Sequence, residues 1–95
     1  MIKVRVFTHP TCTTCPTAIR LAQRLADENP DVELHIISLG SVRGREAAKA
    51  AGVLSVPTVF VSEQRFVGVP GWGELVSALN RERSKYTEYA IRSAQ

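Results

Sequence analysis

The sequence predicts a single small α/β domain with the element order β-α-β-α-β-β-α. The chain has 95 residues, of which 44% are hydrophobic and 22% charged, as in ordinary globular domains. Apolar residues alternate in some segments, as in strands, and recur at three- and four-residue intervals in others, as in helices. Short stretches rich in Gly, Pro, Asn and Ser separate these segments, so each change of period marks a new element.

The first half of the chain is predicted to form a strand, a helix and a second strand. Residues 2–7 alternate apolar and charged side chains, which is typical of a strand with one buried face. Apolar residues from Thr14 onward have helical spacing, and Pro16 suits the first turn, where its missing N–H is tolerated. The proline-containing break at 29–31 ends this helix, and residues 32–38 alternate again.

The second half is predicted to form a helix, two strands and a last helix. Ser41 is a suitable N-cap for a short helix over 42–51, which a glycine ends. Residues 53–61 are rich in β-formers, and a tight turn at 62–64 leads into a second strand at 65–67. The last helix has one apolar face, formed by Trp72, Leu75, Val76 and Leu79.

The chain divides into a predicted domain at residues 1–80 and a polar segment at residues 81–95. The polar segment carries only scattered apolar side chains, so we expect it either to extend the last helix or to fray.

Charge and hydropathy exclude several classes of function. Twelve Lys and Arg oppose nine Asp and Glu, which gives a net charge of +3, and the basic residues are scattered. A nucleic-acid-binding surface needs a concentrated basic stripe, usually with aromatic side chains between the charges. No apolar run is long enough for a membrane span or an export signal. We therefore expect a cytoplasmic protein that binds neither nucleic acid nor membranes.

The two cysteines stand in one C-x-x-C motif, Cys12-Thr13-Thr14-Cys15, between the first strand and the first helix. The unpaired N–H groups and the dipole of a helix N-terminus favour a thiolate at the first position. Cys12 is therefore the expected nucleophile. Cys15, one turn later, is expected to displace a bound substrate from Cys12, and this two-electron exchange needs no bound cofactor.

Other uses of this spacing compete with redox exchange. A purely structural disulfide would close a very short loop and add little stability. Covalent haem attachment requires a histidine after the motif, where Pro16 stands. Zinc usually takes four ligands, and His9 and His35 lie on different predicted elements. Two alternatives stay open: a copper or zinc carrier that uses both cysteines, and a non-catalytic interaction module whose Tyr86 and Tyr89 dock a partner.

Three polar residues near the cysteines have two interpretations each. His9 either acts on the Cys12 thiol, as a cation or proton donor, or is an exposed loop residue, and the second interpretation is favoured. Thr13 and Thr14 either donate hydroxyl hydrogen bonds to sulfur or cap the helix. The sequence does not decide between the two roles of the threonines.

Four segments together carry a family resemblance: Val6-Phe7-Thr8, Pro10-Thr11-Cys12-Thr13-Thr14-Cys15-Pro16, Val56-Pro57-Thr58 and Phe66-Val67-Gly68. With them the sequence resembles the thioredoxin and glutaredoxin superfamily over residues 2–80, and most closely its small archaeal-type glutaredoxin-like thioredoxins. The resemblance implies a thioredoxin-like fold, with a central four-stranded mixed sheet flanked by helices. It also implies a dithiol–disulfide oxidoreductase that acts on protein disulfides.

The resemblance further implies a substrate-binding set of residues. In the family the proline before the third strand is cis and lies against the disulfide, so a cis Val56–Pro57 bond is expected. The backbone of Val56 would pair with the substrate chain by strand addition. Gly68 would let a partner backbone approach closely, and Thr11, where typical thioredoxins have Trp, completes the set.

The chain departs from typical members of the family at three further places. Thr13-Thr14 stands between the cysteines where typical thioredoxins carry Gly-Pro. Val6 stands where thioredoxins keep a buried acid, so proton transfer to and from Cys15 would use water or another group. Residues 68–71 lack the acid of a glutathione clamp. We expect a monomer with no bound cofactor or metal, recycled either by a thioredoxin-reductase-like flavoenzyme or by a thiol pool.

Overall fold

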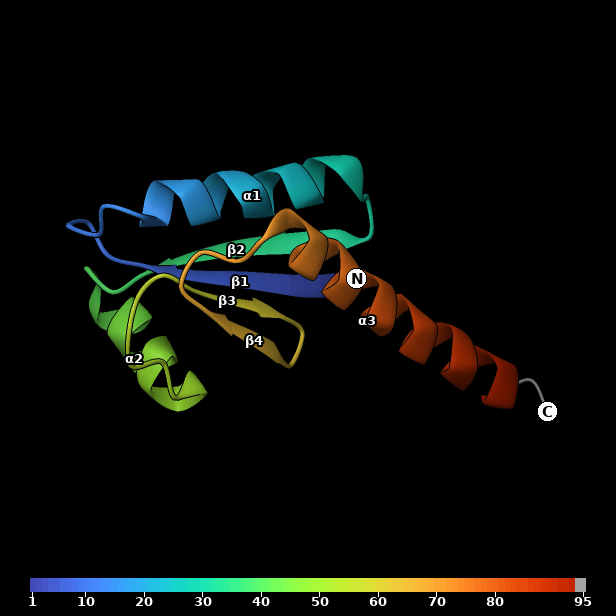
Figure 1. Cartoon of the computed structure of the whole chain (residues 1–95). Coiled ribbons are helices and arrows are strands. Elements are labelled where there is room, and N and C mark those ends of the chain that lie inside the picture. Colours follow the sequence, from blue (N-terminus) through green and yellow to red (C-terminus); the bar gives the residue numbers. More distant parts are fainter. Residues whose placement is uncertain (94–95) are drawn as a thin grey trace.

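Four strands form one mixed sheet in the order β2-β1-β3-β4, and helices cover its faces (Figure 1). The structure is a computed structural model that describes the backbone of residues 1–93 and the side chains of residues 1–85. Its elements are, in chain order, β1 (Ile2–Thr8), α1 (Cys15–Glu28), β2 (Val32–Ser38), α2 (Val42–Ala51), β3 (Thr58–Val61), β4 (Gln64–Val67) and α3 (Trp72–Ser93). The predicted element order and the four-stranded mixed sheet are confirmed.

Strand β1 is central to the sheet. It pairs in parallel with β2 over its whole length and antiparallel with β3, and β3 continues into the antiparallel β3–β4 hairpin. Parallel neighbours cannot be joined by a tight turn, and α1 provides the crossover between β1 and β2. Because β1 is covered on both faces, it carries three side chains without exposed surface: Val4, Val6 and Phe7.

Helices α1 and α3 pack against the same face of the sheet and form the larger core with it. Their buried side chains are small or branched and repeat at helical spacing, as the sequence predicts for an amphipathic helix. Helix α1 contributes Ala18, Ala22 and Leu25, and α3 contributes Leu75, Ala78 and Leu79. This layer anchors α1, the helix that begins with Cys15.

Helix α2 covers the other face and forms a smaller core there, made of Phe7, Ala48, Val53 and Phe60. The predicted cap at Ser41 is confirmed, because its side-chain oxygen accepts a hydrogen bond from the N–H of Gly44 at 3.0 Å. The predicted stop at Gly52 is confirmed as well, because this residue has the left-handed conformation (φ 69°) that ends many helices.

Three predicted boundaries differ from the structure. Helix α1 begins at Cys15, and Thr14 is its N-cap. The β-rich stretch predicted over 53–61 forms a strand only from Thr58, since Pro57 has no N–H to give to the sheet and the preceding residues form bends. Strand β4 begins at Gln64, one residue earlier than predicted.

Helix α3 continues past residue 80 to Ser93, and its side chains just beyond residue 80 contact the domain. Arg83 donates hydrogen bonds to Asp31 at 2.8 and 2.9 Å, and these bonds hold the pKa of the Asp31 carboxyl below its usual value. The side chains of Tyr86 and Tyr89 lie outside the described part, so their docking role stays a prediction, as does the division at residue 80. Among the described helices, none is both long and apolar enough to cross a membrane.

The close approach of α2 to β2 gives a test of the packing. A Cβ atom added at Gly44 would lie 1.6 Å from the backbone oxygen of Ser38, whereas one added at Gly73 in α3 meets nothing within 4 Å. We expect Gly44→Ala to lower the free energy of unfolding by about 1–3 kcal/mol through overpacking. Gly73→Ala should leave the stability unchanged or slightly raise it, because alanine is the better helix former. Urea unfolding measures both, and equal stability of the two variants would contradict the packing described.

Candidate active site

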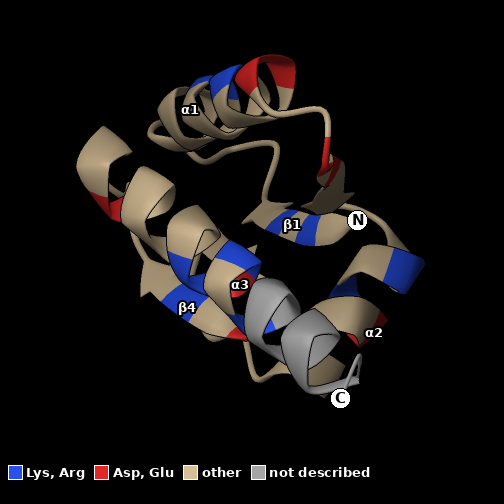
Figure 2. Cartoon of the chain, turned by 90° about the vertical axis from the view of Figure 1, so that its right-hand side faces the viewer, with Lys and Arg blue, Asp and Glu red and all other residues tan. Residues whose placement is uncertain are grey.

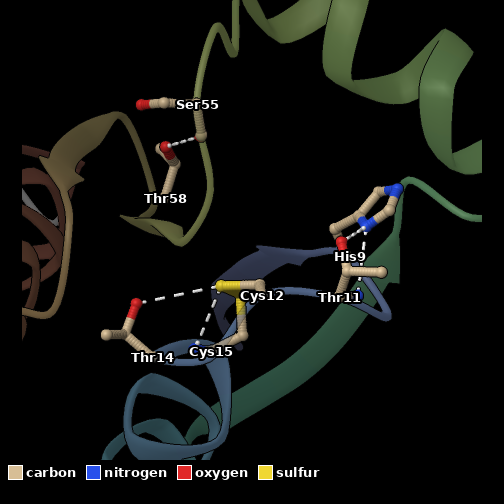
Figure 3. Close-up of a disulfide and its surroundings, with 7 residues drawn as sticks. All are labelled: His9, Thr11, Cys12, Thr14, Cys15, Ser55 and Thr58. Carbon is tan, nitrogen blue, oxygen red and sulfur yellow. Dashed lines mark hydrogen bonds between the residues drawn. A yellow bond between two sulfur atoms is a disulfide. The ribbon is translucent and has the colours of Figure 1, made fainter.

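Cys12 and Cys15 form a disulfide where β1 gives way to α1 (Figure 3). Their Cα atoms lie 5.5 Å apart. Cys12 belongs to the loop and is partly exposed, whereas Cys15 is the first residue of α1 and only 2% exposed. A sulfur from another molecule can therefore approach Cys12 while the fold shields Cys15.

A tight turn presents Cys12. Its N–H donates to the carbonyl oxygen of His9 at 3.0 Å, which closes the turn around Pro10 and Thr11. The His9 ring reinforces the turn, since Nδ1 accepts the N–H of Thr11 at 3.2 Å and lies 2.9 Å from Thr11 Oγ1. In the described part of the chain, His9 makes no hydrogen bond to either sulfur. The geometry thus favours the exposed-loop interpretation of His9, with the addition that its ring holds the turn through Nδ1.

The sulfur of Cys12 lies at the N-terminus of α1 and receives two polar contacts. The N–H of Cys15 donates to Cys12 Sγ at 3.2 Å, and Thr14 Oγ1 lies 3.8 Å from the same sulfur. Thr14 makes no side-chain capping hydrogen bond although it occupies the N-cap position. Of the two roles considered for Thr14, the structure therefore contains the contact with sulfur and not the side-chain capping hydrogen bond.

The segment that contains the predicted substrate-binding residues Val56 and Pro57 passes the disulfide, as its neighbours Ser55 and Thr58 show in Figure 3. The Val56–Pro57 peptide bond is cis, as the resemblance implies. Thr58 Oγ1 donates to the carbonyl oxygen of Ser55 at 2.7 Å and ties this segment together.

Gly68 joins the same segment, because its N–H donates to the carbonyl oxygen of Pro57 at 2.8 Å. It has φ 88°, a conformation that favours glycine, and a Cβ atom placed there would meet nothing within 4 Å. The structure thus brings Pro57 and Gly68 together. Thr11, the fourth residue of the predicted set, is exposed beside Cys12, with its side chain bonded to the His9 ring.

Two exposed apolar residues near this segment were not predicted. Leu54 is 98% exposed and stands two residues before Val56, and Val69 is 40% exposed and follows Gly68 directly. In the sequence Leu54 belongs to the β-rich stretch at 53–61 and looks like a core residue, and Val69 lies just after the strand predicted at 65–67. Only their positions in loops beside the cis bond identify them as surface, and no periodic pattern contains that information.

In the described part of the chain, no group of three or more His, Cys, Asp and Glu side chains is placed to hold a metal ion.

A C-x-x-C disulfide at the start of the helix that follows the central strand, with a cis-proline segment passing it, defines the class of thiol–disulfide oxidoreductases. The chain belongs to the thioredoxin family. A sequence profile of that family, described as "Thioredoxin domain", matches residues 2–80.

The chain is similar over most of its length to archaeal relatives. It is 33% identical to the "Thioredoxin" of Methanocaldococcus jannaschii, over 84% of this chain and 94% of the relative. It is 35% identical to the "Probable Thioredoxin" of Methanothermobacter marburgensis, over 86% of this chain and 96% of the relative. The predicted family and the predicted activity, thiol–disulfide exchange, are confirmed.

Solved structures show the same fold. Thioredoxin 1 of Thermosipho africanus superposes with a TM-score of 0.72 at 20% identity, over 90% of this chain and 98% of that one. A domain of alkylhydroperoxide reductase AhpF from Enterococcus faecalis superposes with a TM-score of 0.72 at 29% identity, over 82% of this chain and 37% of that one. The thioredoxin-like fold predicted from the sequence is confirmed.

The contact between Thr14 and Cys12 leads to a prediction for the reduced protein. Thr14→Val keeps the shape of the side chain but removes the hydroxyl, so the Cys12 thiolate loses a donor. We expect iodoacetamide to alkylate Cys12 about two- to fivefold more slowly at neutral pH, the effect of one weak hydrogen bond. Thr14→Ser keeps the donor and should react at the rate of the parent protein. An equal loss in Thr13→Val, which removes a hydroxyl with no contact to sulfur, would contradict the role of Thr14.

Proposed function

We propose that this protein reduces or exchanges disulfides of other proteins, with Cys12 as the attacking and Cys15 as the resolving residue. The observation that carries the assignment is the asymmetry of the pair, in which a partly exposed sulfur at a helix N-terminus is bonded to a buried one. The reductive reaction starts from the dithiol. The Cys12 thiolate attacks one substrate sulfur, a mixed disulfide forms, and the other substrate sulfur leaves and takes up a proton.

The second step regenerates the disulfide of the protein. Cys15 gives up its proton and attacks Cys12 Sγ, and the bond to the substrate breaks, so that the substrate leaves as a dithiol with two electrons and two protons. Val6, where typical thioredoxins have a buried acid, is fully buried in the apolar core and offers no proton acceptor. The Cys15 proton therefore passes to water or to another group.

The substrate chain binds along the segment of Val56 and Pro57. Neither the N–H nor the carbonyl of Val56 has a hydrogen-bond partner among the described residues, so both are available to an extended substrate chain. Gly68 leaves room beside Pro57 for that backbone, Thr11 borders it next to Cys12, and the exposed Leu54 adds an apolar contact. The unpaired backbone of Val56 supports this mode of binding.

The setting of the reaction is part of the proposal. The protein works as a monomer in the cytoplasm, with no bound cofactor, on protein disulfides. Its electrons come from a thioredoxin-reductase-like flavoenzyme or from a thiol pool. The archaeal relatives named as thioredoxins support protein disulfides as the substrates and a reductase as a partner.

Single replacements of the cysteines test the mechanism. Cys12→Ser removes the nucleophile and should abolish the reduction of insulin disulfides by dithiothreitol above the uncatalysed rate. Cys15→Ser keeps the attack but removes the resolving thiol, so a mixed disulfide with the substrate should accumulate and appear as an adduct in intact-mass spectra. Rates equal to the parent protein in both variants would refute the proposed roles.

A further inference from the structure

A pocket of about 530 Å³ opens on the face of the sheet that α2 covers. Three alanines of α2 line it together with Arg5, Phe60, Glu63 and Arg65. Neither cysteine is among its lining residues, so the pocket is separate from the active site described above.

The register of the sheet places an arginine on each side of one aromatic residue. Arg5 in β1 lies opposite Phe60 in β3, and Phe60 lies opposite Arg65 in β4. The Cζ atom of Arg5 is 4.6 Å from the centre of the Phe60 ring, and that of Arg65 is 5.1 Å from it. Figure 2 shows basic segments on both β1 and β4. Cation–π contacts with the ring therefore orient both guanidinium groups at the pocket.

The two arginines differ in their hydrogen bonds. Arg65 donates to the carbonyl oxygens of Ala51 at 2.6 Å and Gly52 at 3.0 Å, and so satisfies the C-terminal end of α2. The Arg5 side chain is half-buried, yet it makes no hydrogen bond and no ion pair with any described residue. A partly buried guanidinium group interacts more strongly with an anion than a fully exposed one, because less water screens the charge. Arg5 thus offers a preoriented set of donors with no acceptor among the described side chains.

We propose that this pocket binds a carboxylate group, with Arg5 as its bidentate partner. The planar fork of a guanidinium group matches the two oxygens of a carboxylate. The pocket lining has two positive charges and one negative charge, from Glu63, so its formal charge suits a monoanion better than a doubly charged phosphate.

The rest of the lining indicates the body of the ligand. The alanines of α2 provide an apolar surface for a short aliphatic chain, whereas the Phe60 ring is only 5% exposed and lies against the two arginines. A free aliphatic acid and the C-terminus of a peptide present this same chemistry. The site would thus add carboxylate recognition to a redox protein, on a surface that disulfide exchange does not use.

A titration followed by ¹H–¹⁵N NMR tests the site on the full chain. Butyrate should shift the Arg5 Nε–Hε signal and the amide signals of residues 5, 60 and 65 in a saturable way, at constant ionic strength. Butyramide, its neutral isostere, should not shift them, and inorganic phosphate should bind more weakly than butyrate. N-acetyl trialanine with a free C-terminus distinguishes a peptide end from a free aliphatic acid as the ligand. If this peptide binds more tightly than butyrate, the site recognises peptide C-termini; if it binds more weakly, the site recognises small acids.

Variants of Arg5 complete the test. Arg5→Gln should weaken butyrate binding at least tenfold. Arg5→Lys keeps the charge but not the planar fork, and it should weaken butyrate binding at least threefold. If Arg5→Gln does not fold, the result for Arg5→Lys decides. Arg20→Gln changes the net charge equally on α1 and should bind like the parent protein. Insulin reduction should stay unchanged in Arg5→Lys, which separates this site from the proposed redox function. Any of four results would overturn the proposal: no saturable shift with butyrate, equal shifts with butyramide, tighter binding of phosphate than of butyrate, or unaltered butyrate binding in both Arg5 variants.

Discussion

The site depends on one constraint, which is that the two sulfur atoms flank the point where a buried strand passes into a helix. Strand β1 is paired on both edges and covered on both faces, so the loop after it begins from a fixed position. Helix α1 is held by its apolar stripe, and this keeps Cys15 in the interior. Cys12 stays in the loop, where the N–H of Cys15 reaches its sulfur at 3.2 Å. The fold thereby makes one sulfur accessible and the other protected.

The two faces of the sheet contribute differently to the protein. The face under α1 and α3 is a continuous apolar core that fixes the helix carrying Cys15. The face under α2 has a smaller core, and beyond it the sheet carries charged side chains, including Arg5 and Arg65 around Phe60. One layer therefore supports the redox site, while the other leaves a charged pocket at the surface. This division leaves room in a chain of 95 residues for the carboxylate site that we propose.

Periodicity predicted β1, α1, β2 and α3, because each of them has a regular apolar pattern, whereas a cap, a β-rich composition and a tight turn predicted α2, β3 and β4. The composition misplaced the start of β3, since Val53 is buried by packing against Phe7 and Phe60 in a segment that is not a strand. The motif and the resemblance predicted Cys12, Cys15 and the cis bond before Pro57. The partner of Thr14 could not be predicted, because it depends on the path of the loop at residues 9–14. The arrangement around Phe60 depends on a strand register that local sequence does not contain.

The equilibrium reduction potential of the Cys12–Cys15 pair tests most directly whether the two residues form a reversible redox couple. The protein is incubated at graded ratios of reduced to oxidised glutathione or dithiothreitol, and its free thiols are counted. We expect one two-electron transition in which both thiols are lost together, at or below about −230 mV for a reductant of protein disulfides. If no disulfide forms within the chain at any ratio, the pair is not a redox couple and the proposed function is wrong.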